Sequence, residues 1–138
     1  MKEVNGRRAR DLMQTDVRTV GKGTLLIEAA GMMRANKVSS LIIEPEDDKD
    51  AFGIITQKDI VEALIGDEIY GGSHVVEDVM SKPAITVDGR LAIGHCLRTM
   101  SMFSVRRLPV TDGPKLVGIL SYSDIFNELV NVTSEETS

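Results

Sequence analysis

GIITQKDI (residues 53–60) and GILSYSDI (residues 118–125) are two versions of one pattern, set 65 residues apart. In each version a glycine opens a short apolar run, a hydroxyl residue closes it, and an aspartate follows three residues later. Such a run is typical of a strand that passes directly into a helix. Because this junction occurs twice, the chain is expected to be built from a repeat.

The repeat extends upstream of both junctions at a spacing of 67 residues. Asp11-Leu12-Met13 matches Asp78-Val79-Met80, and Thr19-Val20 matches Thr86-Val87. The change in spacing falls in the acidic stretch Glu44–Asp50, which fits a hairpin-loop insertion. We therefore predict a duplication with repeat 1 at residues 8–66, a connector at 67–75, repeat 2 at 76–131 and a polar tail at 132–138.

Both halves follow the same order: a short strand, a helix, two apolar strands and a closing helix. In the first half these elements are expected near 19–20, 24–36, 41–43, 52–55 and 56–65. In the second half they are expected near 85–87, 91–103, 108–110, 116–120 and 121–130. Helices are predicted from helical spacing of apolar residues, and strands from short apolar runs. The fold class is therefore α/β (α+β), with two β-α-β-β-α halves and a tail that is expected to fray.

Composition excludes several classes of function. The one cysteine, Cys96, rules out an internal disulfide and a cysteine-cluster metal site, and neither His74 nor His95 has metal-ligand spacing. A net charge of −5 and 4% aromatic residues disfavour general nucleic-acid binding. No apolar run is long enough to span a membrane, and no nucleophile elbow, zinc-binding helix or Walker loop is present. We expect a cytoplasmic, non-catalytic protein without a metal.

The hydroxyl and carboxylate of each junction are the first candidate site residues. Thr56 and Ser121 lie where unpaired backbone N–H groups of a helix start favour an anion such as a phosphate. Asp59 and Asp124 lie one turn further on, and a carboxylate can accept both vicinal hydroxyls of a ribose. From local sequence alone, a helix capping box explains the same pairs better. The glycine of each junction leaves room for a ligand or a neighbouring backbone.

Over about residues 8–130 this pattern resembles the cystathionine-β-synthase (CBS) domain pair, or Bateman module. The resemblance is carried by the Asp-hydrophobic-Met openings, the Thr-Val strands, Arg107-Leu108-Pro109-Val110 and the two Gly-x-x-Thr/Ser-x-x-Asp junctions. It implies a pseudo-two-fold pair of repeats with two clefts that bind adenosine-containing ligands and report to a partner protein. With no enzyme, channel or kinase domain visible, the chain is similar to stand-alone CBS-pair proteins.

The resemblance also assigns roles to residues. A basic strand start, here Arg106 and Arg107, reaches phosphates in related pairs, whereas the first half has Ser39-Ser40 at this place, so unequal clefts are expected. The Thr-Val strands align with family strands that contact adenine through backbone atoms. The predicted ligand-binding residues are Thr19, Val20, Thr56, Asp59, Thr86, Val87, Arg106, Arg107, Pro109, Ser121 and Asp124.

The expected function is a regulatory module for AMP, ADP, ATP or S-adenosylmethionine, with NAD also left open and the protein partner unknown. The alternatives are an interaction or dimerisation scaffold with vestigial clefts and an enzyme acting on nucleotides, although the chain lacks an acid–base constellation. A homodimer is expected because apolar residues gather near the ends of the module. These residues are Leu64, Ile65, Ile69, Tyr70, Leu129 and Val130.

Overall fold

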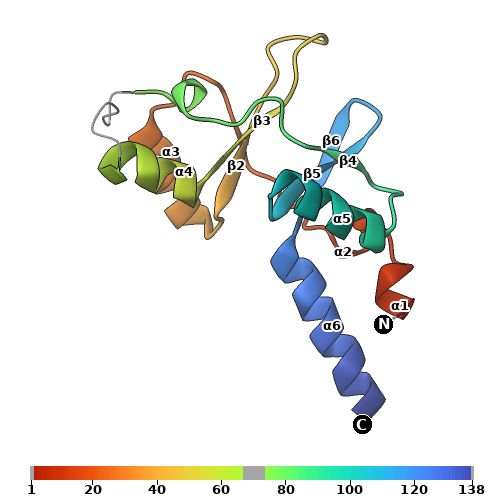
Figure 1. The fold of residues 1–138 in the computed structure, drawn as a ribbon. Coiled ribbons are helices and arrows are strands. Elements are labelled where there is room, and N and C mark those ends of the chain that lie inside the picture. The colour runs from red at the N-terminus through yellow and green to blue at the C-terminus, as the bar shows by residue number, and fades with distance from the viewer. Residues whose placement is uncertain (1, 67–73, 138) are drawn as a thin grey trace. The chain divides into compact units, whose positions relative to one another are not determined.

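The computed structural model describes residues 2–66 and 74–137. The chain divides into two compact units: unit 1 comprises residues 1–17 and 85–138, and unit 2 comprises residues 18–84. Each unit contains one three-stranded sheet with helices, so the α/β fold class and the β-α-β-β-α order of both halves are confirmed (Figure 1).

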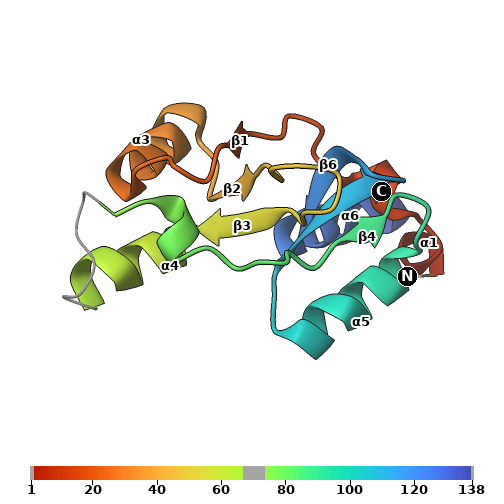
Figure 2. The same ribbon diagram turned by 90° about the horizontal axis from the view of Figure 1, so that it is seen from above.

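Unit 2 is built on the sheet order β1-β2-β3, with β1 parallel and β3 antiparallel to the central β2 (Figure 2). Its core is formed by apolar side chains of α3 packed with those of β2 and β3, including Leu26, Leu41 and Ile55 at 0% exposure. Its elements are β1 (Thr19–Val20), α3 (Leu26–Asn36), β2 (Ser40–Ile43), β3 (Gly53–Thr56), α4 (Gln57–Val61), the π-helix η1 (Glu62–Gly66) and the 3-10 helix η2 (Val76–Asp78).

Unit 1 repeats this sheet as β4-β5-β6, again with a parallel and an antiparallel pair around the central strand. Its core includes Leu108, Val110 and Leu120, and the helix α1 packs against α5 and α6 through the buried Val4. Its elements are α1 (Lys2–Asn5), α2 (Ala9–Leu12), β4 (Val87–Asp88), α5 (Ile93–Phe103), β5 (Arg107–Asp112), β6 (Lys115–Ser121) and α6 (Tyr122–Thr137).

Each unit contains a segment that precedes the first strand of the other sequence repeat, so these two leading segments are exchanged between the units. The segment before β1 packs in unit 1, where Arg8 bridges to Ala92 and Gln14 to Ile119. The segment before β4 packs in unit 2, with bridges at the equivalent positions. These bridges join Leu25 to Val75 and Ile54 to Ser81. The folded units therefore differ in composition from the repeats along the sequence.

The exchanged segments also complete the helices that they meet. The first N–H of a helix has no partner inside the helix. In α3 that group, Leu26 N, donates to His74 O at 2.8 Å, and in α5 Ile93 N donates to Arg7 O at 2.7 Å. Both helices begin two residues later than the sequence predicted, after Leu25 and Ala92 in extended conformation.

In each unit, the methionine of an Asp-hydrophobic-Met opening packs against the junction glycine of the other sequence repeat. A Cβ on Gly53 would lie 2.8 Å from Met80 Sδ and 3.3 Å from Ile43 Cβ. A Cβ on Gly118 would collide with Met13 Sδ and lie 2.9 Å from the backbone oxygen of Gln14. The glycine is needed because the methionine of the exchanged segment packs directly over it, with a neighbouring backbone carbonyl close by.

Four features differ from the sequence expectation. The predicted helix 56–65 is a short α-helix, α4, followed by the π-helix η1. The polar tail is helical, because α6 continues to Thr137. Thr86 lies one residue before β4, which begins at Val87. The helices α1, α2 and η2 were not predicted, and most of the connector, including Ile69 and Tyr70, lies outside the described residues.

Candidate ligand-binding site

The junction of unit 2 forms a capping box. Thr56 N donates to Asp59 Oδ2 at 2.9 Å, and Asp59 N donates to Thr56 Oγ1 at 3.3 Å. Thr56 is in extended conformation and is the N-cap of α4, so the strand turns into the helix at this residue. The capping interpretation of the pair is confirmed, and both side chains remain half-buried at the surface of the unit.

The junction of unit 1 has the same cap and one more hydrogen bond. Ser121 N and Ser121 Oγ donate to Asp124 Oδ2 at 2.8 and 2.9 Å, and Asp124 N donates to Ser121 Oγ at 3.2 Å. The other carboxylate oxygen, Oδ1, accepts from Gln14 Nε2 at 2.9 Å. Gln14 was not among the predicted site residues, although its alignment with the shorter Ser81 marks a difference between the repeats.

The two arginines at the start of β5 have different surroundings. Arg107 is half-buried and pairs in register with Ser121, so the two side chains share one face of the sheet, opposite the core residues Leu108 and Leu120. The exposed Arg106 precedes the strand and lines a surface depression between α5 and the start of α6. In unit 2 the register pair equivalent to Arg107 and Ser121 is Ser40 and Thr56.

The remaining predicted residues fall into two groups. Thr19 and Thr86 are accessible at least in part, and Thr19 Oγ1 donates to Glu44 Oε1 at 2.8 Å. Val20 and Val87 belong to the two cores at 7% and 6% exposure, and Pro109 is fully buried. For these three buried residues, only backbone atoms remain as candidates for contact with a ligand.

The cysteine and the possible metal-ligating side chains are the remaining groups that could carry chemistry. Cys96 is fully buried in the core of unit 1, and burial raises the pKa of its thiol to about 11. No group of three His, Cys, Asp or Glu side chains there could hold a metal ion. Across residues 2–66 and 74–137, no helix has the length and apolar character needed to cross a membrane.

Comparison with protein families gives one match that occurs twice. The model of the CBS domain matches residues 9–66 and again residues 76–131. An uncharacterized protein of Methanopyrus kandleri is 31% identical over 116 residues, which are 83% of this chain and 59% of that protein. The chain therefore spans less than two thirds of this relative.

Solved structures share the fold. A hexameric CBS-CP12 protein from bloom-forming cyanobacteria has a TM-score of 0.81 at 31% identity, covering 86% of this chain and 66% of that chain. The CBS domain pair of protein MJ0100, solved in complex with 5′-methylthioadenosine and S-adenosyl-L-methionine, has a TM-score of 0.78 at 24% identity. That match covers 90% of this chain and 96% of that chain.

Proposed function

Since the chain belongs to the CBS-domain family, we propose that it is a regulatory module that binds adenosine-containing ligands of the AMP, ADP and ATP class at its two strand-to-helix junctions. The observation that carries the proposal is the repeated junction, in which a half-buried aspartate uses Oδ2 for the helix cap. The other oxygen is left to a ligand in Asp59, whereas in Asp124 it accepts from Gln14. The bound 5′-methylthioadenosine and S-adenosylmethionine of the MJ0100 pair support the adenosyl class of ligand.

The residues have distinct roles in this proposal. Asp59 and Asp124 accept hydrogen bonds from the ribose hydroxyls, which suits a carboxylate with several acceptor sites. Thr56 contributes a hydroxyl donor beside the phosphate, and Ser121 contributes one when its hydroxyl turns from Asp124 Oδ2 to the phosphate. Arg107 contributes a planar guanidinium on the same sheet face as Ser121. Backbone atoms of Thr19-Val20 and Thr86-Val87 line the adenine, and Arg106 and Pro109 complete the proposed set.

The regulatory mechanism is differential affinity. A ligand that binds one conformation of the chain or its assembly more tightly shifts the population toward that conformation, and a protein partner responds to the shift. The proposal contains no catalytic step. Incubation of the chain with ATP or AMP should therefore leave the nucleotide intact in a chromatographic assay, and release of product would favour the nucleotide-acting enzyme instead.

A thermal-shift screen with adenosine, AMP, ADP, ATP, S-adenosylmethionine and GMP as control tests the proposal. A ligand that binds only the folded state raises the free energy of unfolding by about 2.7 kcal/mol at 100 times its Kd. We expect adenosyl ligands to raise Tm and GMP to leave it unchanged. No shift with any adenosyl ligand, for a chain that unfolds cooperatively, would contradict the proposal and leave the scaffold alternative.

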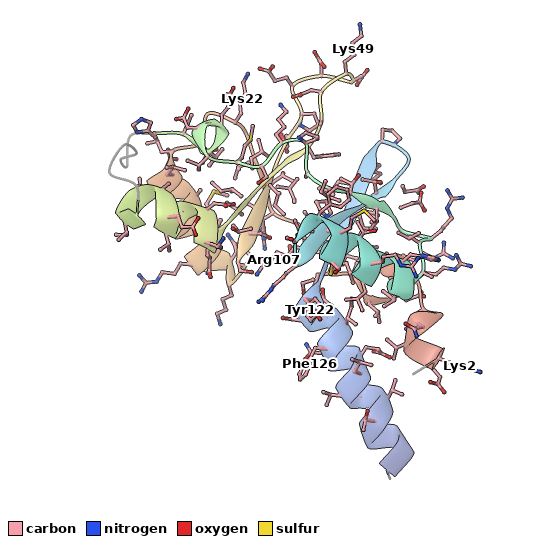
Figure 3. The ribbon with its side chains drawn as sticks, viewed as in Figure 1. Lys2, Lys22, Lys49, Arg107, Tyr122 and Phe126 are labelled. Atoms are coloured by element: carbon pink, nitrogen blue, oxygen red, sulfur yellow. The ribbon has the colours of Figure 1, made fainter. Side chains whose placement is uncertain are left out.

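We also propose a homodimer formed through the closing helices. On α6, Tyr122, Phe126 and Val130 are 53%, 60% and 47% exposed, and Figure 3 shows Tyr122 and Phe126 on the side of α6 turned away from α1. In unit 2 the positions equivalent to Phe126 and Val130 are Val61 and Ile65, which are 58% and 78% exposed. Exposed apolar side chains gathered in this way are typical of an interface.

Light scattering at tens of micromolar protein tests the homodimer. The wild-type chain should have the mass of a dimer, and Phe126→Ser should shift it toward the monomer because a polar residue replaces a central apolar contact. Ser123→Ala, an exposed position of the same helix, is the matched control. A monomer mass for the wild-type chain would refute the dimer.

A further inference from the structure

The two proposed ribose carboxylates are not equally available. Asp124 Oδ1 accepts a hydrogen bond from Gln14 Nε2 at 2.9 Å, in addition to the cap on Oδ2. Asp59 has the cap on Oδ2 and receives no further side-chain hydrogen bond from the described residues. The difference lies at the oxygen that the cap leaves for a ligand.

The number of unused hydrogen-bond acceptor sites differs between the two carboxylates. An ionised carboxylate offers about four acceptor sites. Asp124 uses three of them, for Ser121 N, Ser121 Oγ and Gln14 Nε2, so about one remains. Asp59 uses one, for Thr56 N, so about three remain. Two vicinal ribose hydroxyls need two sites, which Asp59 offers as it stands and Asp124 offers only after Gln14 has left.

The position of Gln14 is fixed by the backbone and not by its side chain. Gln14 N donates to Ile119 O at 2.8 Å, and Ile119 N donates to Gln14 O at 2.9 Å. Ser81 makes the same two hydrogen bonds with Ile54 in unit 2, at 2.9 and 3.0 Å. A serine is therefore compatible with this backbone bridge, and the inequality of the two carboxylates depends on a single amide side chain.

We infer that Gln14 is an internal competitor for the ribose at Asp124, so that adenosine fills the Asp59 site first and the Asp124 site only as the Gln14 side chain is displaced. This inference rests on the proposed function and adds an order of filling to it. It assigns Gln14 a role in setting ligand affinity. The exchanged segment that carries Gln14 thereby acts on the junction of the other sequence repeat.

The test uses adenosine, which lacks a phosphate and so does not report on the charge difference between Arg107 and Ser40. Calorimetry on Asp59→Ala isolates the Asp124 site, and calorimetry on Asp124→Ala isolates the Asp59 site. In the Asp59→Ala background, Gln14→Ser should raise adenosine affinity about 2- to 10-fold, because a competing hydrogen bond has been removed. In the Asp124→Ala background, Gln14→Ser should change nothing.

The reciprocal variant makes the test symmetric. Ser81→Gln places an amide beside Asp59, so in the Asp124→Ala background it should lower adenosine affinity about 2- to 10-fold. Thermal unfolding of each variant checks the fold. The side-chain amide signals of Gln14 in NMR spectra give a second measurement: saturating adenosine should shift them toward their positions in Asp124→Ala.

Three results would overturn the inference. If Gln14→Ser leaves the affinity of the isolated Asp124 site unchanged, Gln14 does not compete; if it weakens binding, Gln14 contacts the ligand instead. Both results leave the proposed function intact, because adenosine still binds. If adenosine and the nucleotides bind neither the wild-type chain nor any variant, the proposed function fails and this inference fails with it.

Discussion

At its strand-to-helix junction, unit 2 leaves one oxygen of Asp59 without a side-chain hydrogen bond from the described residues, whereas in unit 1 the equivalent oxygen of Asp124 accepts from Gln14. On the neighbouring strand, Ser40 of unit 2 stands where Arg107 stands in unit 1. The backbone bridges, the methionine over the glycine and the capping box are the same in both units. The two units thus share one backbone frame and differ in the side chains that a ligand is proposed to meet.

If the two units share one backbone arrangement, truncation of an equivalent core side chain should destabilise each unit to a similar extent. Leu41 and Leu108 hold equivalent positions and are both 0% exposed. Leu41→Ala and Leu108→Ala should each lower the free energy of unfolding by about 2–5 kcal/mol, from lost burial and the cavity left behind. Urea denaturation followed by circular dichroism measures both. A loss below about 1 kcal/mol in one variant alone would show that the two cores are packed differently.

The carboxylates should matter in both units. Asp59→Ala and Asp124→Ala each remove hydrogen bonds to a charged group worth about 1.5–3 kcal/mol, which corresponds to about 10- to 150-fold in nucleotide affinity. Calorimetry with AMP measures the effect. Asp59→Asn and Asp124→Asn keep an oxygen for the cap and serve as controls for the fold. Unchanged affinity in both alanine variants would remove the site assignment.

Alanine substitutions at the two junction glycines should destabilise the units unequally, because the new Cβ meets different atoms in each unit. Gly118→Ala meets a backbone oxygen at 2.9 Å as well as Met13, whereas Gly53→Ala meets mainly the flexible end of Met80. Overpacking costs about 1–3 kcal/mol, and we expect Gly118→Ala to lie at the upper end of this range and Gly53→Ala at the lower end. Urea denaturation ranks them. The reverse order would mean that the Gln14 backbone yields more easily than the Met80 side chain.

Arg107 should make the binding of phosphate-bearing ligands salt-sensitive. Arg107→Ala should weaken AMP and ATP about 5- to 10-fold and adenosine much less, because a charge-assisted contact to phosphate is lost. In the wild-type chain, added salt should weaken AMP binding more than adenosine binding. Arg106→Ala, measured beside Arg107→Ala, tells which of the two proposed arginines contacts the phosphate. If Arg107→Ala lowers the affinities for AMP and adenosine equally, this arginine does not contact the phosphate.

The smallest expected effect concerns the loop of unit 2, which is longer than its counterpart. Lys82 Nζ lies 2.7 Å from Asp50 Oδ1, and the hydrogen bond from Lys82 holds the pKa of this carboxyl at about 2. A pKa below the unfolded value stabilises the fold above that value, and the contribution is lost as pH falls toward 2. Lys82→Ala should therefore lower Tm slightly at pH 7 and much less at pH 2. Equal loss at both pH values would point to packing instead.

Local signals in the sequence predicted the junctions, the order of elements and the capping boxes, because each depends on residues close together in the chain. The exchange of leading segments was not predictable in this way. A repeat at fixed spacing aligns Met13 with Met80 but does not say which glycine each methionine covers. The hydrogen bond from Gln14 to Asp124 was missed for the same reason, since Asp124 lies 110 residues away in the chain.

The helix boundaries show a different limit. The apolar pattern of 56–65 fits one helix, yet the structure changes from α4 to a π-helix after Val61. The polar residues after Val130 carry no apolar stripe, so the sequence predicted a frayed end, whereas α6 continues to Thr137. Polar composition sets exposure and does not by itself end a helix.

The exchange of leading segments also sets an order of events during synthesis. Unit 2 is a continuous stretch, residues 18–84, and all of its strands are synthesised before those of unit 1. Unit 1 needs both ends of the chain, since Gln14 pairs with Ile119. Because synthesis proceeds at about 5–20 residues per second, residues 1–17 are made several seconds before β6. During that interval the N-terminal segment lacks its β6 partner, and its charged Arg7, Arg8 and Arg10 favour hydration of the segment.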